Sequence, residues 1–319
     1  MHVVHDVDAH RPRERASVVA IGVFDGLHRG HQRIIEQLRF LAQEHGALST
    51  VVTFDPHPAL VLDPPRAPLL VGTLEQRVEG LAALGVDQVR ILTFNEELAR
   101  ESAHSFVERV LVGELATRDV VIGENFRFGY EREGGVALLR AEGMAHHFDV
   151  HPALIYGDGQ PWSSTAVRRA LHEGDVLRAN AVLGRPFTLR GLVVHGDARG
   201  ASLGYPTANL ALAPRQQLPE QGIYAGALRR ANSTWWPAAI SIGTRPQFYD
   251  NGALLVEAHV VGYRDELYDA TVDVAFLARL RGETTFPGVP ELIAQMDIDV
   301  VQTIGIFEKF SPETSALLG

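Results

Sequence analysis

Two histidines three residues apart stand in a glycine-rich stretch near the N-terminus, Gly22–His31. An apolar run precedes this stretch and a helical pattern follows it, and the start of a helix offers free backbone N–H groups and a partial positive charge to an anion. Gly22 and Gly30 let the backbone approach a phosphate closely, and the rings of His28 and His31 can donate to the same oxygens. Because the stretch holds no nucleophile, it predicts in-line attack by a substrate phosphate on a bound nucleoside triphosphate. The alternative is a turn with two incidental surface histidines.

A second glycine-rich segment, Gly196–Gly204, leads into Pro-Thr-Ala-Asn at residues 206–209. The Thr207 hydroxyl and the Asn209 carbonyl are hard oxygen donors two residues apart, which suits a Mg²⁺ ion that keeps most of its waters. By itself the glycine segment is typical of a hairpin loop. The whole string predicts a clamp for a Mg-nucleotide.

Alternation along the predicted strand Leu254–Val261 places Glu257 and His259 on one face and apolar side chains on the other. The pattern alone favours a pair that faces solvent. A carboxylate in reach of a hydroxyl proton could instead act as a general base.

Ser164 and Thr165 open a predicted helix that carries Arg168 on its next turn. Hydroxyls, N–H groups and a fixed cation at a helix start can hold phosphates, although a plain N-cap explains the two hydroxyl residues equally well.

The chain holds one lysine, Lys309, which stands between Glu308 and Phe310. A P-loop needs lysine after glycine and before Ser or Thr, and a protein kinase needs lysine on an early strand. The sequence contains neither pattern. Binding of ATP must therefore depend on Mg²⁺, arginine, histidine and backbone N–H groups.

Composition excludes several other classes of protein. The 319 residues carry a formal charge of −10 and no cysteine, which excludes disulfides, Cys-ligated metals and a Cys nucleophile and argues against a nucleic-acid surface. The first fifteen residues lack the apolar core of a signal peptide. No apolar run reaches the ~18 residues of a membrane span, so we expect a cytoplasmic protein.

Strands alternate with helices in the first half of the chain. The predicted strands are 18–24, 50–54, 86–94, 119–123 and 147–154, and the predicted helices are 30–45, 73–84, 104–115 and 136–145. Such alternation predicts a Rossmann-like parallel sheet covered on both faces, which binds ligands at the carboxyl ends of its strands.

The second half consists of short β-rich segments separated by Gly, Pro and Asp. The predicted strands are 187–195, 222–228, 237–242, 254–261 and 271–280, followed by a helix at 289–307. This spacing predicts an antiparallel β-barrel with a terminal helix. We place the domain boundary between residues 183 and 184, which gives domains 1–183 and 184–319.

The histidine stretch resembles the His-x-Gly-His nucleotidyltransferases, and the Pro-Thr-Ala-Asn motif resembles riboflavin kinases. Together with Thr53–Pro58, Ile122–Gly129 and Ser163–Arg168, they make the chain similar to the prokaryotic bifunctional riboflavin kinase/FAD synthetases over about residues 17–300. The resemblance implies phosphorylation of riboflavin to FMN and adenylylation of FMN to FAD, with Mg-ATP in both steps and small molecules as partners.

The resemblance also implies a role for each candidate residue. The catalytic residues would be His28, His31 and Glu257; ATP would contact Gly22, Phe24, Gly30, Ser164, Thr165, Arg168, Gly200 and Gly204; the flavin would contact Phe54, Asn125, Arg281 and Glu283; and Mg²⁺ would bind Thr207 and Asn209. The sequence departs from the family pattern at Ser241, Arg245 and Gln247. A monofunctional FAD synthetase whose barrel only binds flavin is therefore an alternative, and a non-enzymatic flavin or nucleotide sensor is another. The sequence leaves open whether the protein forms a homo-oligomer.

Overall fold

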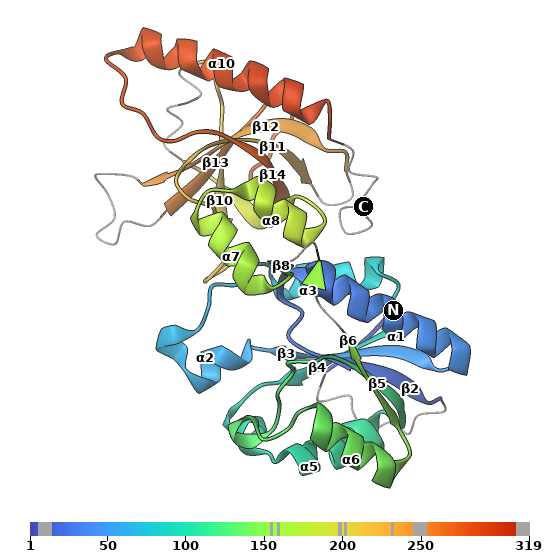
Figure 1. The fold of residues 1–319 in the computed structure, drawn as a ribbon. Helices are drawn as coiled ribbons and strands as arrows, with labels where there is room; N and C mark the ends of the chain where they lie inside the picture. Colours follow the sequence, from blue (N-terminus) through green and yellow to red (C-terminus); the bar gives the residue numbers. More distant parts are fainter. Residues whose placement is uncertain are drawn as a thin grey trace. The chain divides into compact units, whose positions relative to one another are not determined.

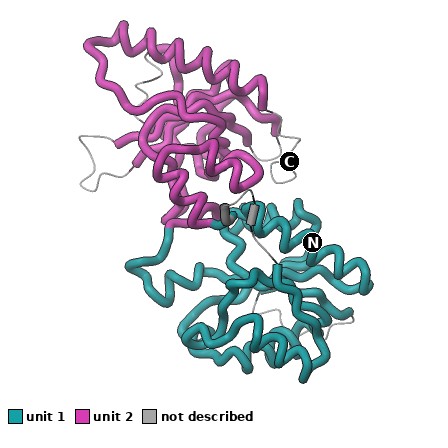
Figure 2. Tube along the Cα trace, viewed as in Figure 1, with its two compact units in different colours: residues 1–68, 74–163 teal, residues 69–73, 164–319 magenta. Residues whose placement is uncertain are grey.

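The computed structural model describes residues 1–5, 15–153, 156–157, 160–196, 200, 203–230, 233–244 and 254–310. The chain forms two compact units, one from Met1–Pro68 and Leu74–Ser163 and the other from Leu69–Thr73 and Ser164–Gly319 (Figure 2). Each unit has its own sheet and its own hydrophobic core.

Six parallel strands form the sheet of the first unit, in the spatial order β1-β4-β3-β2-β5-β6. They are β1 (His2–Val4), β2 (Ser17–Ile21), β3 (Leu48–Asp55), β4 (Gln88–Thr93), β5 (Thr117–Gly123) and β6 (Asp149–Ala153). β3 lies on one side of β2 and β5 on the other, so the winding direction reverses between β2 and β5. Open α/β sheets bind ligands at the carboxyl ends of such strands. Here Gly22 follows β2 directly, and Asn125 comes soon after β5.

Helices cover both faces of this sheet (Figure 1). The apolar stripe of α1 (Arg29–His45) packs on one face, and α5 (Ala103–Phe106), η4 (Val107–Glu114) and α6 (Val136–His146) cover the other. The remaining elements of this unit are η2 (Asp25–Leu27), α2 (Pro58–Leu62), η3 (Pro64–Arg66), α3 (Leu74–Ala83), α4 (Glu96–Arg100), η5 (Tyr130–Arg132), β7 (Tyr156–Gly157) and β8 (Gln160–Pro161). The predicted Rossmann-like arrangement is confirmed.

Several elements differ from the sequence-based expectation, and three of them have a clear physical reason. The single helix expected for 104–115 is divided, because the chain passes from α5 into the π-helix η4, and apolar periodicity cannot distinguish a π turn from an α turn. β1 has three residues, too few for alternation to be visible. β10 (Ala208–Leu212) begins inside the turn-rich Pro-Thr-Ala-Asn motif, which conceals it.

The second unit is built around a closed antiparallel barrel with the strand order β10-β13-β12-β11-β14-β9. Besides β10, its strands are β9 (Phe187–Val194), β11 (Gly222–Arg230), β12 (Trp236–Thr244), β13 (Leu254–Val260) and β14 (Thr271–Arg281). Its interior is filled by side chains such as Tyr224, Ile240 and Phe276. The predicted terminal helix, α10 (Val289–Phe307), packs outside β11, β12 and β14 (Figure 1). The barrel prediction is confirmed.

Two helices before the barrel, α7 (Ser164–His172) and α8 (Val176–Leu183), share its hydrophobic core. The Asn180 side chain links α8 to two strands: its Nδ2 donates to the Phe276 carbonyl at 2.9 Å, and its Oδ1 accepts from Phe187 N at 2.7 Å. The chain thus passes from one compact unit to the other after Ser163. A boundary between two activities at residue 183 stays a prediction, since compactness does not test it.

Among the described residues, no helix combines the length and the apolar character that crossing a membrane requires.

Replacing Asn180 should loosen the barrel unit. Asn180→Ala leaves the Phe276 carbonyl and the Phe187 N–H without their side-chain partner, and we expect the free energy of unfolding to fall by about 2 kcal/mol. Urea denaturation followed by tryptophan fluorescence measures this change. Leu177→Ala on the exposed side of the same helix is the matched control, and equal midpoints for the two variants would contradict the prediction.

Candidate active sites

The turn between β2 and α1 holds the two predicted histidines. Phe24 and Gly26 take left-handed backbone conformations, with φ of 55° and 78°, and a Cβ on Gly22 would come within 3.2 Å of the Phe24 ring. His28 then caps α1, because its Nδ1 accepts from His31 N at 3.4 Å. Since Nδ1 accepts, a neutral His28 carries its proton on Nε2.

The imidazole rings of His28 and His31 stack, with 3.6 Å between their centroids and 23° between their planes. The Nδ1 of His31 is buried and has no hydrogen-bond partner among the described residues. Burial, then the neighbouring His28, then the Arg77 guanidinium hold the pKa of His31 well below its ordinary value of 6.5. His31 is therefore uncharged near neutral pH, and an arriving anion would favour its protonation.

A cavity of about 560 Å³ lies at the carboxyl edge of the first unit's sheet. Its aromatic lining consists of Phe54, Phe94, Phe106, Phe126 and Phe128. Three predicted site residues line it, namely Gly22, Phe54 and Asn125. The lining suits a flat fused-ring ligand, which aromatic faces and edges bind well.

Three residues predicted to bind ATP together with the histidine turn belong to the other compact unit. Ser164, Thr165 and Arg168 are on α7, in the compact unit that contains the barrel. Within that unit, the Arg168 Nε donates to the Leu69 carbonyl at 2.6 Å. Because the histidine turn belongs to the other unit, the joint phosphate site stays a prediction.

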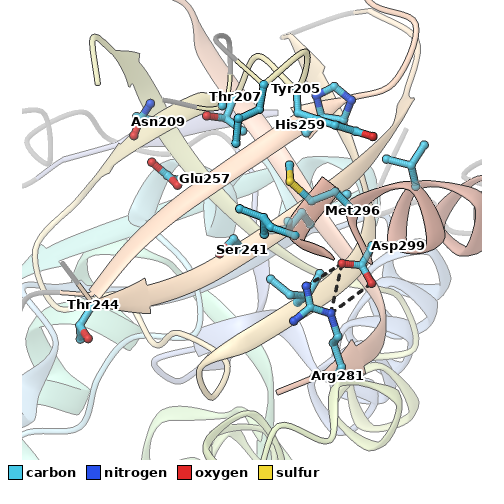
Figure 3. Close-up of a pocket in the computed structure, with 17 residues that line it drawn as sticks. Tyr205, Thr207, Asn209, Ser241, Thr244, Glu257, His259, Arg281, Met296 and Asp299 are labelled. Atoms are coloured by element: carbon cyan, nitrogen blue, oxygen red, sulfur yellow. Dashed lines mark hydrogen bonds and ion pairs between the residues drawn. The ribbon is translucent and has the colours of Figure 1, made fainter. Parts of the chain in front are cut away.

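A second cavity, of about 410 Å³, lies between the outer face of the barrel and α10 (Figure 3). Five predicted site residues line it: Gly200, Thr207, Asn209, Glu257 and Arg281. The helix contributes Leu292, Met296, Asp299 and Val300. Ile240 belongs both to this lining and to the packed core of the barrel.

Strand pairing sets Asn209, Glu257 and Ser241 in one row. Asn209 pairs with Glu257 between β10 and β13, and Glu257 pairs with Ser241 between β13 and β12. Directly paired residues of antiparallel strands point to the same side, so an amide, a carboxylate and a hydroxyl follow one another across the outer face. Alternation predicts the shared face of Glu257 and His259 correctly, but both side chains are half-buried in the cavity wall and do not simply face solvent.

Two glycines leave room around the predicted metal donors. A Cβ on Gly196 would lie 2.3 Å from Asn209 Nδ2, and one on Gly200 would lie 2.3 Å from the Tyr205 carbonyl oxygen. The Gly200 carbonyl accepts from Tyr205 N at 2.8 Å, which closes the segment on itself. Any side chain at either position would displace the groups beside it.

The donor set fits a magnesium ion. Thr207 and Asn209 offer uncharged hard oxygens, and phosphate oxygens and water can complete an octahedron around Mg²⁺. His259 Nδ1 donates to the Pro206 carbonyl at 2.9 Å and so fixes the residue before Thr207. In the part of the chain that the structure describes, no group of three or more His, Cys, Asp or Glu could hold a metal.

The two predicted flavin contacts of the barrel, Arg281 and Glu283, differ from each other in their surroundings. Arg281 lines the cavity but is paired with buried Asp299, with 2.8 Å from Nη2 to Oδ2 (Figure 3). Glu283 does not line it; its carboxylate lies over Gly243, where a Cβ would meet Oε1 at 2.1 Å. Gly204 is also outside the lining. Arg245, Gln247 and residues 197–199 and 201–202 of the glycine segment lie outside the described residues.

A third, smaller cavity of about 160 Å³ shares one wall with the second. Thr207 lines both. The smaller cavity is otherwise lined by apolar residues, by Tyr263 and Tyr268 and by the acidic residues Asp265 and Glu266. The Tyr268 ring stacks on His195 with 3.8 Å between centroids. Two ligands bound in the two cavities would therefore meet at Thr207.

Sequence reasoning misses two buried charges near these sites. Arg77 lies on the buried side of α3 with Leu81, and Asp299 lies on that of α10 with Thr303. A charged residue in the apolar stripe of a helix was the available signal, because such a residue must find a partner or a function.

Two family models match this chain. The FAD synthetase model matches residues 10–166, and the riboflavin kinase model matches residues 183–307. Together with the Rossmann-like unit, the closed barrel and a cavity in each, they define the class: an enzyme that joins an FAD synthetase half to a riboflavin kinase half.

Curated relatives extend the match to the whole chain. Bifunctional riboflavin kinase/FMN adenylyltransferases are similar in Pseudomonas fluorescens (37% identical, 94% of this chain, 96% of the relative) and Listeria monocytogenes (36%, 92% and 93%). The chain belongs to the bifunctional riboflavin kinase/FMN adenylyltransferase family. A crystal structure described as a macrolide-efflux protein from Streptococcus pneumoniae has the same fold, with a TM-score of 0.85, 28% identity and coverage of 97% of this chain and 99% of that one.

The pKa of His31 should depend on ligand. In the protein without ligand it lies well below 6.5, and bound Mg-ATP should raise it because the phosphates favour the imidazolium. NMR titration of the imidazole resonance, assigned with His31→Gln, measures both values. The unfolded chain binds a proton at this histidine more readily than the folded chain, so the free energy of unfolding should fall as pH drops below 6.5, and fall less in His31→Gln. A ligand-free pKa at or above 6.5 would contradict this.

Proposed function

We propose that the barrel unit phosphorylates riboflavin to FMN and that the Rossmann-like unit adenylylates FMN to FAD, each with Mg-ATP. The observation that carries this proposal is the gathering of Thr207, Asn209 and Glu257 in one cavity of the half that matches riboflavin kinases. A barrel that only bound flavin would have no use for a carboxylate beside two metal donors. The same gathering argues against a non-enzymatic sensor.

Riboflavin would occupy the cavity beneath α10. Ile223, Leu292 and Met296 offer apolar contact for the ring system, and the polar row lies toward the strands. Glu257 would accept the proton of the ribityl 5′-hydroxyl while its oxygen attacks the γ-phosphorus of ATP and ADP leaves. The Arg281 and Glu283 contacts predicted for the flavin are kept in this proposal. The Arg281–Asp299 pair would then hold the guanidinium in place.

The nucleotide of the kinase would lie in the smaller cavity, on the other side of Thr207. This arrangement brings the γ-phosphate to the common wall, where the hydroxyl acceptor also arrives. Gly200 and Gly204 would cover the phosphates. Thr207 and Asn209 would hold Mg²⁺, which when bound offsets the charge of the phosphate oxygens.

FMN would occupy the aromatic cavity of the first unit. Its phosphate oxygen would attack the α-phosphorus of ATP, forming the new P–O bond as pyrophosphate leaves. The N–H groups of His28 and His31 would stabilise the charge on the reacting phosphates, and Gly22, Phe24 and Gly30 would let the backbone approach them. Ser164, Thr165 and Arg168 are kept in the proposal as further phosphate contacts. We also keep a cytoplasmic location, where ATP is supplied, and the absence of nucleic acid among the partners.

Separate mutations should separate the two activities. His28→Ala should lower FAD formation from FMN by about 10²–10³-fold, because it removes a donor to the reacting phosphates, and leave FMN formation near wild type. Glu257→Gln should lower FMN formation by about 10²–10⁴-fold, because it removes the general base, and leave FAD formation from supplied FMN unchanged. Chromatography of the flavin products measures both.

Each variant is the control for the other. A loss of both activities in both variants would contradict the assignment of one reaction to each unit. Wild-type protein that converted FMN but not riboflavin would instead favour the monofunctional alternative.

Gly196→Ala should damage the kinase alone. Its Cβ would overlap the Asn209 amide, so we expect the Mg²⁺ concentration for half-maximal FMN formation to rise about tenfold, a loss equivalent to about 1.4 kcal/mol. Gly305→Ala is the matched control, because nothing lies within 4 Å of the added carbon. An unchanged Mg²⁺ dependence in Gly196→Ala would remove Asn209 from the metal site.

A further inference from the structure

Arg77 is a buried cation in the first unit whose surroundings join the histidine turn to the aromatic cavity. It lies on α3 and is 4% exposed. α3 packs against η2, the turn that leads to His28. A buried guanidinium is costly to maintain without a function or a full set of partners.

One nitrogen of Arg77 binds the end of β3 and, through Thr53, is linked to the segment that follows β2. Its Nη1 donates to Thr53 Oγ1 at 3.2 Å and to the Phe54 carbonyl at 3.1 Å. The Thr53 hydroxyl in turn donates to the Val23 carbonyl at 3.1 Å. Val23 and Phe54 both line the aromatic cavity. Arg77 therefore determines, through Thr53, how this wall of the cavity is spaced.

The same guanidinium acts on His31. Its charge is one of the causes that lower the pKa of His31, beside burial and His28. Asp25, Asp55 and Glu75 are the acidic groups that act on Arg77 itself, where they oppose the lowering of its own pKa by burial. The Arg77 guanidinium thus interacts electrostatically both with these carboxylates and with His31.

Arg90 is a second buried arginine of the same unit, and its hydrogen bonds differ from those of Arg77. Arg90, equally buried in β4, donates its Nε to Glu114 at 3.0 Å and its Nη1 to the Ile91 carbonyl at 3.1 Å. The Nε of Arg77 is buried and has no hydrogen-bond partner among the described residues. Leaving a buried donor unpaired destabilises a fold, so fold stability alone does not account for an arginine at this position.

We infer that Arg77 is a positioning residue for adenylyl transfer: through Thr53 it fixes the Val23 and Phe54 wall of the flavin cavity in relation to His31. This inference rests on the assignment of that reaction to the first unit. Two effects follow and can be separated. The planar guanidinium sets the geometry of the wall, and its positive charge adds to burial and to His28 in lowering the pKa of His31.

Two variants of Arg77 test the two effects. Arg77→Lys keeps the positive charge but loses the planar guanidinium and its fixed N–H donors. The KM for FMN in adenylyl transfer should therefore rise about tenfold while the pKa of His31 stays low. Arg77→Met loses both, so kcat/KM should fall about 100-fold and the pKa of His31 should rise. Steady-state kinetics and NMR titration of His31 in the full chain provide the readouts.

Three controls distinguish positioning from loss of folding. FMN formation by the barrel is measured in each preparation and should stay at wild type. Arg90→Met should destabilise the same unit without raising the KM for FMN of the folded fraction or changing the pKa of His31. Thr53→Val removes only the linking hydroxyl, and it should raise the KM for FMN with the pKa of His31 unchanged even if Arg77→Met does not fold.

The inference is overturned if Arg77→Lys and Thr53→Val keep the wild-type KM for FMN, or if Arg90→Met reproduces the kinetic changes of Arg77→Met. Failure of the proposed function has a different signature. In that case the wild-type chain makes no FAD from FMN, whereas the effect of Arg77→Met on the pKa of His31 still reports whether the guanidinium acts on the imidazole.

Discussion

Close approach of the backbone to bound phosphate is the constraint on which both candidate sites depend. With a single lysine in the chain, phosphate charge must be met by arginine, imidazoles, hydroxyls, a metal ion and backbone N–H groups, and the N–H groups act only at short range. In the first unit, the left-handed residues Phe24 and Gly26 turn the chain into the start of α1. In the barrel unit, Gly200 lies so near the Tyr205 carbonyl that no side chain fits. Both turns follow a strand held in a sheet, so rigid hydrogen-bonded backbone supports each of them.

The same reasoning explains what the sequence could and could not predict. Periodicity identifies most strands and the terminal helix, because each depends on local apolar patterning. The row formed by Asn209, Glu257 and Ser241 depends on strand register across three strands, and alternation within one strand gives the face without the neighbours. The grouping of α7 with the barrel depends on contacts between distant residues. Arg77 of α3 escapes notice for the same reason, since its partners Thr53 and Phe54 lie on β3, more than twenty residues earlier in the chain.

The interior of the barrel is a packed hydrophobic core, and the candidate site lies on its outer surface. Val256 and Ala258 fill the interior, whereas Glu257 between them faces outward. An outward carboxylate on an open strand would be fully hydrated, and its value as a base would be small. α10 changes this situation because Leu292 and Met296 cover the strands and enclose the cavity. The helix is held there in part by the Arg281–Asp299 pair, which joins it to the end of β14. The apolar helix is thus as necessary to the proposed kinase site as the polar row.

The two proposed reactions need different proton chemistry, and the two sites differ accordingly. A ribityl hydroxyl must lose its proton to become a good nucleophile, which requires a base, and in the proposed function Glu257 of the barrel cavity is that base. The phosphate of FMN is already ionised, so adenylyl transfer requires no base at the nucleophile. It requires donors where charge gathers on the reacting phosphates. In the proposed function the stacked pair His28 and His31 supplies these donors, and burial, His28 and Arg77 lower the pKa of His31. Uncharged imidazoles cost less to bury before the substrate arrives, and the phosphates themselves supply the negative charge that favours protonation afterwards.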